Sequence, residues 1–158
     1  MKESLGEANE ELKRVEHLVH VSLKYTRTVD VLMNTLSRMV DAYDHLLDAL
    51  LKYAAEQGMI EEAPTTPKEK ADVTKKLFKK EELVTDNVGL YTLFRQVLKS
   101  NPERINEYRR HVTLITFVHG NEIQIHIDNI TDYFHIQKDF YNYISQLVTE
   151  AQNTEEES

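Results

Sequence analysis

The chain has 158 residues, enough for one domain with a single core, and it contains no cysteine. The lack of cysteine excludes disulfides, thiolate metal sites and cysteine nucleophiles. A formal net charge of −8 opposes broad affinity for nucleic acid, because binding to a phosphate backbone depends on counterion release to lysine and arginine. The N-terminus lacks the apolar core of a secretory signal, and no apolar run is long enough for a membrane span. We therefore expect a cytoplasmic protein with no membrane partner.

Charge is unevenly distributed along the chain. Residues 65–111 carry 11 basic and 7 acidic residues, whereas the segments before and after them are acidic. Contacts with anions are therefore expected first in this basic segment.

Residues 12–57 carry a regular apolar pattern without glycine or proline. Alternating steps of three and four residues are typical of a helix that packs lengthwise against other helices. A second apolar row, from Val19 to Ala54, widens the stripe to what a helix inside a bundle needs. The seam consists of Val15, Leu18, Ser22, Tyr25, Val29, Leu32, Leu36, Met39, Tyr43, Leu46, Leu50 and Tyr53.

The length of this stretch bears on assembly. A continuous helix here would be roughly 69 Å long, whereas a compact chain of this size has a radius of gyration of about 15 Å. Either the helix breaks into a hairpin, or a second chain covers the part that protrudes. Helix propensity is lowest between Thr26 and Thr35, but no turn residue is present there. We therefore expect one long helix and, with it, a homodimer.

A glycine and a proline mark the next boundary. Gly58 matches a C-terminal helix cap, and Thr66 and Pro67 begin a capping box that starts a new helix. Lysines cover most of this helix, which predicts a solvated face that pairs with nearby acidic residues. In the alternative interpretation, Lys75 and Lys76 belong to a strip that faces a polyanion.

The pattern changes after the following helix. Segment 100–103 repeats the cap-and-proline signal and predicts a short helix with Ile105 and Tyr108 facing inward. From residue 112 to residue 127 the period falls to two around Gly120-Asn121, a two-residue turn signal that predicts a small β-hairpin. The expected cross-strand pairs are Val118 with Ile123, Thr116 with Ile125 and Leu114 with Ile127.

The last helix has the same heptad spacing as the first, so that the two seams can pack together. The expected fold is mostly α: a helical bundle built on one long N-terminal heptad helix and a C-terminal helix, with a small β-hairpin near residues 112–127. We expect residues 1–152 to form one domain and residues 153–158 to form a disordered acidic tail.

No metal or cofactor is expected. Glycine-rich phosphate loops are absent, because the four glycines stand far apart. His17 and His20 fall on the outer side of the heptad, away from a buried site. Asp132 and His135 have the spacing found in di-iron bundles but lack the matching second helix.

The most concentrated charged cluster contains Arg104, Arg109, Arg110 and His111. In a structural interpretation the arginines pair with acidic residues of the long helix, such as Asp41, Asp44 and Asp48. In a functional interpretation they hold a phosphate, together with Lys75 and Lys76, while His111 transfers a proton. Metal-free ribonuclease chemistry requires this division of labour.

Two resemblances bear on this cluster. Arg104 and His111, separated by six residues, resemble the arginine–histidine motif of the HEPN ribonuclease superfamily. That resemblance implies a helical bundle that dimerises to bring two motifs together, with Arg104 and His111 as catalytic residues. The segments Val21–Val31 and Glu107–Leu114 are similar to uncharacterised helical proteins of archaeal genomes, a resemblance that implies no particular activity.

These observations favour a non-enzymatic interaction or scaffold protein, homodimeric, with an unknown protein partner. The alternative is a HEPN-like, metal-independent ribonuclease or an RNA-binding helical protein that uses Arg104 and His111. RNA is the less favoured partner, because the net charge repels polyanions.

Overall fold

The structure is a computed structural model that describes residues 1–157. Its helices are α1 (Lys2–His17), the π-helical turn η1 (Leu18–Ser22), α2 (Leu23–Tyr25), α3 (Val29–Glu56), α4 (Pro67–Leu77), α5 (Glu82–Lys99) and α6 (Ile127–Glu157). Its strands are β1 (Glu103–Ile105), β2 (Thr113–Val118) and β3 (Asn121–His126). The chain is therefore mostly α, with a small antiparallel sheet, as the sequence predicts.

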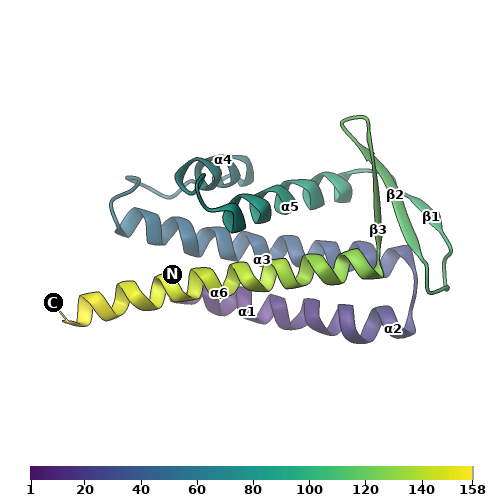
Figure 1. Cartoon of the computed structure of the whole chain (residues 1–158), viewed down its shortest axis with the longest axis horizontal. Helices are drawn as coiled ribbons and strands as arrows, with labels where there is room; N and C mark the ends of the chain where they lie inside the picture. The colour runs from purple at the N-terminus through teal and green to yellow at the C-terminus, as the bar shows by residue number, and fades with distance from the viewer. Residues whose placement is uncertain (158) are drawn as a thin grey trace.

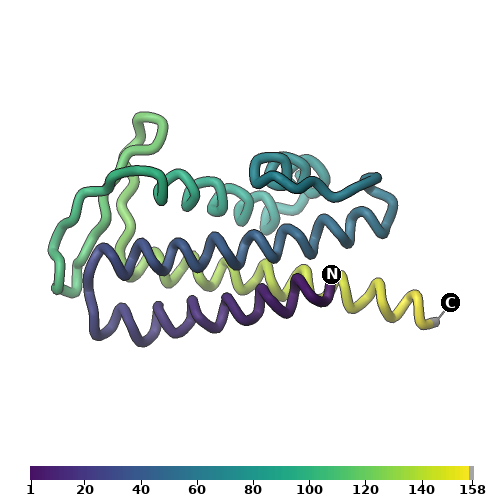
Figure 2. Tube along the Cα trace, turned by 180° about the vertical axis from the view of Figure 1, so that it is seen from behind, coloured from purple at the N-terminus to yellow at the C-terminus, as the bar shows by residue number. Residues whose placement is uncertain are grey.

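Helix α3 lies at the centre of the bundle. Helix α1 runs beside it on one side, α4 and α5 cover another, and α6 completes the packing (Figures 1 and 2). Most seam residues of α3 are fully buried, and so are Leu47, Leu51 and Ala54 of the second row. A helix that is apolar on nearly every side is the one that other helices surround.

The expected single long helix is wrong. The chain leaves the helical conformation at Thr26–Thr28 and turns back, so that α1 and α3 form a helical hairpin. Thr26 and Thr28 adopt extended backbone angles, and the Thr28 side chain accepts a 3.2 Å hydrogen bond from the N–H of Val31. A β-branched residue that also caps the next helix thus makes the turn without glycine or proline. The argument for a homodimer assumed the long helix and no longer applies; the oligomeric state stays a prediction.

The turn η1 changes which residues of the first helix face the core. Val15, Val19 and Leu23 are buried, with steps of four residues, whereas the expected seam residue Tyr25 is 77% exposed. The i→i+5 hydrogen bonds of a π turn include one residue more than an α-helical turn, and this rotates the apolar row. The seam predicted at Leu18, Ser22 and Tyr25 is therefore wrong.

The short helix expected after Pro102 is also wrong, because residues 103–105 form β1. The side chain of Ser100 does not cap a new helix. Its hydroxyl donates a 2.6 Å hydrogen bond to the carbonyl of Val97 and accepts one from Thr116. Ile105 and Tyr108, expected to face inward, are exposed.

The β-hairpin lies within the predicted range, but its register differs. His119 and Gly120, both with positive φ, form the turn, so that Leu114 pairs with Ile125 and Thr116 with Ile123. The expected register is wrong by two residues, which keeps every side chain on its predicted face. The buried residues Leu114, Thr116 and Ile125 lie on one face of this hairpin, and β2 and β3 contact α5 and α6.

The acidic C-terminus differs from expectation as well. Helix α6 continues to Glu157, through most of the segment predicted to be disordered. Residue 158 lies outside the described residues.

Candidate anion-binding site

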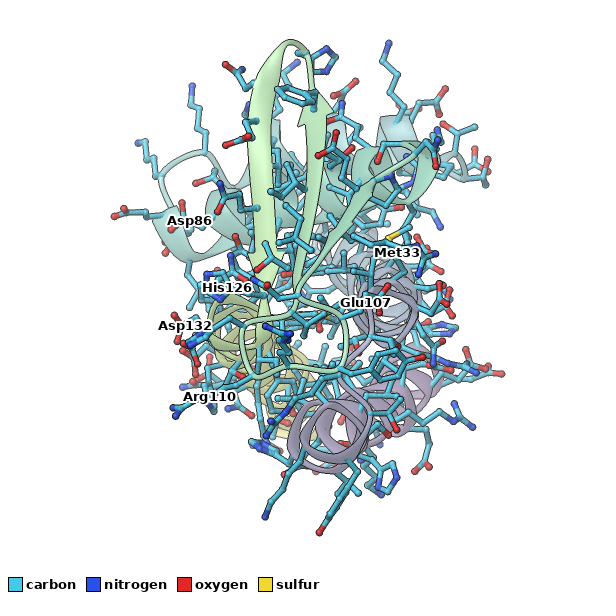
Figure 3. The ribbon with its side chains drawn as sticks, turned by 90° about the vertical axis from the view of Figure 1, so that its right-hand side faces the viewer. Met33, Asp86, Glu107, Arg110, His126 and Asp132 are labelled. Carbon is cyan, nitrogen blue, oxygen red and sulfur yellow. The ribbon has the colours of Figure 1, made fainter. Side chains whose placement is uncertain are left out.

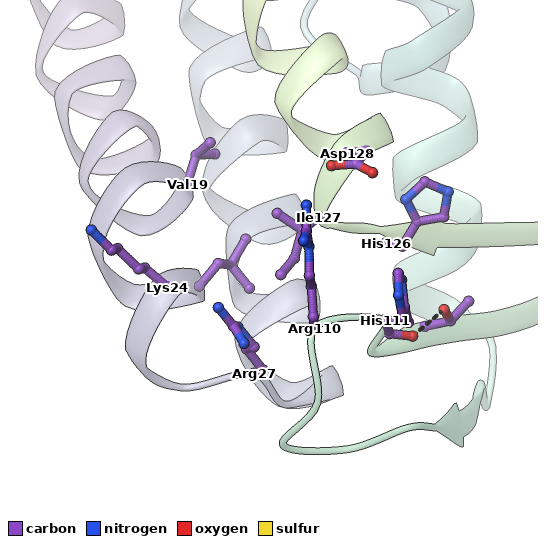
Figure 4. Close-up of a pocket in the computed structure, with 10 residues that line it drawn as sticks. Val19, Lys24, Arg27, Arg110, His111, His126, Ile127 and Asp128 are labelled. Atoms are coloured by element: carbon purple, nitrogen blue, oxygen red, sulfur yellow. Dashed lines mark hydrogen bonds between the residues drawn. The ribbon is translucent and has the colours of Figure 1, made fainter.

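A cavity of about 430 Å³ lies at the end of the bundle where α2, the loop 106–112, β3 and α6 meet (Figures 3 and 4). Lys24 and Arg27 stand on one side of it, and Arg110, His111 and His126 stand on the other. The full lining comprises Val19, Leu23, Lys24, Arg27, Arg110, His111, Thr113, His126, Ile127 and Asp128.

Positive charge dominates this cavity. Three permanent cations, Lys24, Arg27 and Arg110, face a single carboxylate, that of Asp128. The Nε atom of Arg27 is buried and has no hydrogen-bond partner among the described residues. That atom is closed to a ligand as well as to water, so Arg27 can meet an anion only through its terminal guanidinium nitrogens. These groups together are suited to an anion.

The π turn η1 builds one wall. It carries the lining residue Val19 and directly precedes Leu23 and Lys24, which also line the cavity. Single π turns inside α-helices are frequent at functional sites, because they direct side chains away from the regular helical face.

The loop 106–112 builds the opposite wall and is backbone-strained. Asn106 and Tyr108 have φ values of 56° and 66°, a conformation that is uncommon for a non-glycine residue and most unusual for a bulky one. Such strain persists only where surrounding contacts hold it, and it occurs preferentially at functional sites. Here the Tyr108 N–H donates a hydrogen bond to the Arg27 carbonyl, which ties the loop to the turn between α2 and α3.

An ion-pair network anchors the base of the same loop. Arg104 on β1 donates a 2.7 Å hydrogen bond to Asp30 and a 3.2 Å hydrogen bond to Glu107. The bond to Arg104 lowers the pKa of the Asp30 carboxyl, and the same pairing raises the pKa of Arg104. The charges of Asp30 and Glu107 are thus engaged next to the cavity.

Two histidines, His111 and His126, line the cavity. Nδ1 of His126 accepts a 3.4 Å hydrogen bond from the Asn129 N–H, which places the ring hydrogen of the neutral form on Nε2. The carbonyl of His111 accepts a 2.8 Å hydrogen bond from Thr113, which fixes its backbone at the cavity edge.

The residues predicted to contact phosphate lie in different parts of the structure. Arg110 and His111 line the cavity, whereas Arg104 belongs to the network with Asp30 and Glu107 and is not among the lining residues. The structure therefore places Arg104 and His111 in different environments. Arg109 is exposed in the same loop. Lys75 and Lys76 lie on α4, and Lys75 borders a separate groove between α4 and α5.

The structural interpretation expects the arginines to pair with acidic residues of the long helix, and Arg104 does pair with one, Asp30 of α3. Its partner is not Asp41, Asp44 or Asp48, and it also pairs with Glu107. In the structure Asp44 accepts a hydrogen bond from Tyr91, and Asp48 pairs with Lys70. Among the described residues, the side chains of Arg109 and Arg110 make no hydrogen bond or ion pair. They are therefore available to an external anion.

Sequence reasoning missed Lys24, Arg27 and His126. Lys24 and Arg27 lie inside a stretch that reads as continuous helix, and no local feature indicates that a cavity faces them. Within residues 1–157, no group of three or more histidine, aspartate or glutamate side chains could hold a metal ion. Over the same residues, no helix is long and apolar enough to cross a bilayer.

Comparison of the chain with protein-family models, with curated proteins and with solved structures finds no match, so the assignment of this site depends on its geometry.

Proposed function

We propose that this protein is a non-enzymatic binding protein and that the cavity holds the phosphate group of its ligand. The observation that carries the proposal is the excess of three permanent cations over one carboxylate in the lining of the cavity. Guanidinium groups bind phosphate and carboxylate alike through paired, charge-assisted hydrogen bonds. The presence of three cations favours phosphate, because it carries more negative charge than a carboxylate.

The net charge of −8 does not oppose this proposal at short range. Exposed charges farther apart than about 8–10 Å are largely screened at physiological salt. Apart from Asp128 in the lining, the carboxylates of Asp30 and Glu107 already accept hydrogen bonds from Arg104. The acidic residues at the far end of α6 lie at the opposite end of the molecule from the cavity (Figure 1).

Titration with inorganic phosphate and with a mononucleotide tests the proposal, using isothermal calorimetry and the ligand-induced shift in melting temperature. Arg110→Gln and Arg27→Gln should each weaken binding roughly tenfold or more, because a hydrogen bond to a charged group contributes about 1.5–3 kcal/mol. Arg109→Gln and Lys75→Gln are matched controls outside the cavity and should change affinity less than about threefold. Equal effects in both pairs, or no binding by the wild type, would contradict the proposal.

The position of His111 in the cavity favours one second candidate, the metal-independent ribonuclease. The two functions differ in outcome when RNA is incubated with the protein in a chelator. We expect the RNA to remain intact. Cleavage that disappears in His111→Ala, but not in the control His135→Ala, would favour the ribonuclease.

A further inference from the structure

Two exposed tyrosines stand beside the cavity. Tyr25 and Tyr108 are 77% and 78% exposed, more than any other large apolar side chain that the structure shows on the surface. Lys24, a cavity residue, places its Nζ 5.9 Å from the centre of the Tyr25 ring. The Tyr108 N–H bonds to the carbonyl of Arg27, a second cavity residue. The Tyr25 ring thus lies near one cation of the cavity, and the Tyr108 backbone contacts the backbone of another.

The backbone conformation at Tyr108 is one that tyrosine rarely adopts, which suggests that the side chain is there for binding. A φ of 66° is disfavoured for a tyrosine, whereas asparagine or glycine adopts this conformation readily. The hydrogen bond to Arg27 uses only the backbone N–H and would survive either replacement. The exposed phenol ring therefore adds little to the stability of the fold, although the backbone is strained to hold it. This indicates that the ring contacts a ligand.

The arrangement of charge and rings matches a particular ligand chemistry. Proteins that bind single-stranded nucleic acid combine cations along the phosphate backbone with aromatic rings on which unpaired bases stack. One ring would suit a mononucleotide. Tyr25 lies two residues before Arg27, and Tyr108 lies in the loop that bonds to the Arg27 backbone, so that two exposed rings are available to stack with two bases.

We infer that the ligand is a single-stranded nucleic acid, whose phosphate occupies the cavity and whose neighbouring bases stack on Tyr25 and Tyr108. This inference rests on the proposed phosphate site.

Fluorescence anisotropy with labelled ten-nucleotide RNA, the matching DNA and an RNA duplex tests the inference. The single strands should bind more tightly than the duplex and more tightly than a mononucleotide. Tyr108→Asn and Tyr25→Ser should each weaken binding of the single strand by roughly 5- to 100-fold, the range for loss of one stacked base. Phe117→Ser, at a 61% exposed aromatic on the sheet, is the matched control and should leave binding unchanged.

Two further measurements separate the possible failures. Phosphate affinity should stay unchanged in Tyr108→Asn, and its melting temperature should be equal to or above that of the wild type, because asparagine relieves the strained backbone. Phosphate binding together with unaltered RNA affinity in both tyrosine variants would overturn this inference and leave the proposed function standing. Duplex binding equal to single-strand binding would overturn it as well. Absence of phosphate binding would overturn the proposed function itself.

Discussion

The Oε2 atom of Glu107 accepts a 3.2 Å hydrogen bond from the N–H of Val29, the first residue of α3. A carboxylate at this position interacts favourably with the free N–H groups and the dipole of the helix. The bond also joins the loop that carries Arg110 and His111 to the central helix. Figure 3 labels Glu107 and Arg110 in this loop.

Replacement of Glu107 should therefore affect both stability and binding. We expect Glu107→Ala to lower the free energy of unfolding by about 1 kcal/mol, measured by urea denaturation. Phosphate affinity should fall as well, because the loop loses an anchor. Glu103→Ala, on the exposed strand β1, is the control and should stay within about 0.5 kcal/mol of the wild type. If Glu107→Ala behaves like this control, the anchor has been misidentified.

A second prediction concerns the buried phenol of Tyr43. Its hydroxyl donates a 2.7 Å hydrogen bond to Oδ1 of Asn87, and its ring contacts Phe94 and Phe140 in the core. Tyr43→Phe keeps the ring but leaves the buried amide oxygen without a donor, which should reduce the free energy of unfolding by about 1–3 kcal/mol. Tyr141→Phe, at a half-buried tyrosine without such a bond, should change it little. Equal stability of the two variants would exclude a structural role for the Tyr43 hydroxyl.

The third prediction concerns pH. Partial burial raises the pKa of Asp44 above its ordinary 3.8, although its carboxylate accepts a hydrogen bond from Tyr91. The native state then holds the proton more tightly than the unfolded state. Stability that this residue supplies at low pH is lost as pH rises from about 3.8 through the native pKa.

Asp44→Asn removes this titration and still accepts the bond from Tyr91. Relative to the variant, the wild type should become more stable as pH falls from 7 to 4, measured by denaturation at each pH. Asp86→Asn, at an exposed position, is the comparison variant. If instead the variant gains stability relative to the wild type as pH falls, the pKa of Asp44 is lowered in the native state and the prediction is wrong.

The fourth prediction tests the inner face of the sheet. Ile125 is fully buried opposite Leu114. Ile125→Asp would place a carboxylate in an apolar contact and should cost about 3 kcal/mol or more. Gln124→Asp, on the exposed side of the same strand, should be tolerated. An unchanged melting temperature for Ile125→Asp would show that the inner and outer faces have been assigned the wrong way round.

Periodicity predicted the mostly helical fold and the two faces of the hairpin, because both depend on local burial patterns. It failed at the helix break for a specific reason. The step from Tyr25 to Val29 is four residues, so the non-helical residues 26–28 leave the heptad count unchanged. Ser100 led to the wrong prediction of a helix for another reason. Its hydroxyl bonds to the Val97 carbonyl of α5 and to the Thr116 hydroxyl of β2, and the sequence does not show these partners.

The candidate site was predicted only in part. Arg110 and His111 attract notice because they belong to a visible charged cluster. Lys24, Arg27 and His126 join them only because a helix end, a loop and a strand end meet in three dimensions. Conversely, the lysines of α4 form the densest basic run, yet Lys75 and Lys76 lie away from this cavity. Charge density along the chain and charge density in space are different quantities.

The turn η1 makes the conformation of the first helix a determinant of the site. A chain one residue shorter between residues 18 and 22 could form regular α-helix there and keep each later side chain in its present direction, because a π turn accommodates one extra residue. A chain of unchanged length with regular α-helix there would instead rotate each later side chain by about 100° around the axis, and Lys24 would leave the cavity wall without any change in its identity. A substitution that removes the π turn at constant length should therefore cost the cavity its lysine, even where every charged residue is retained.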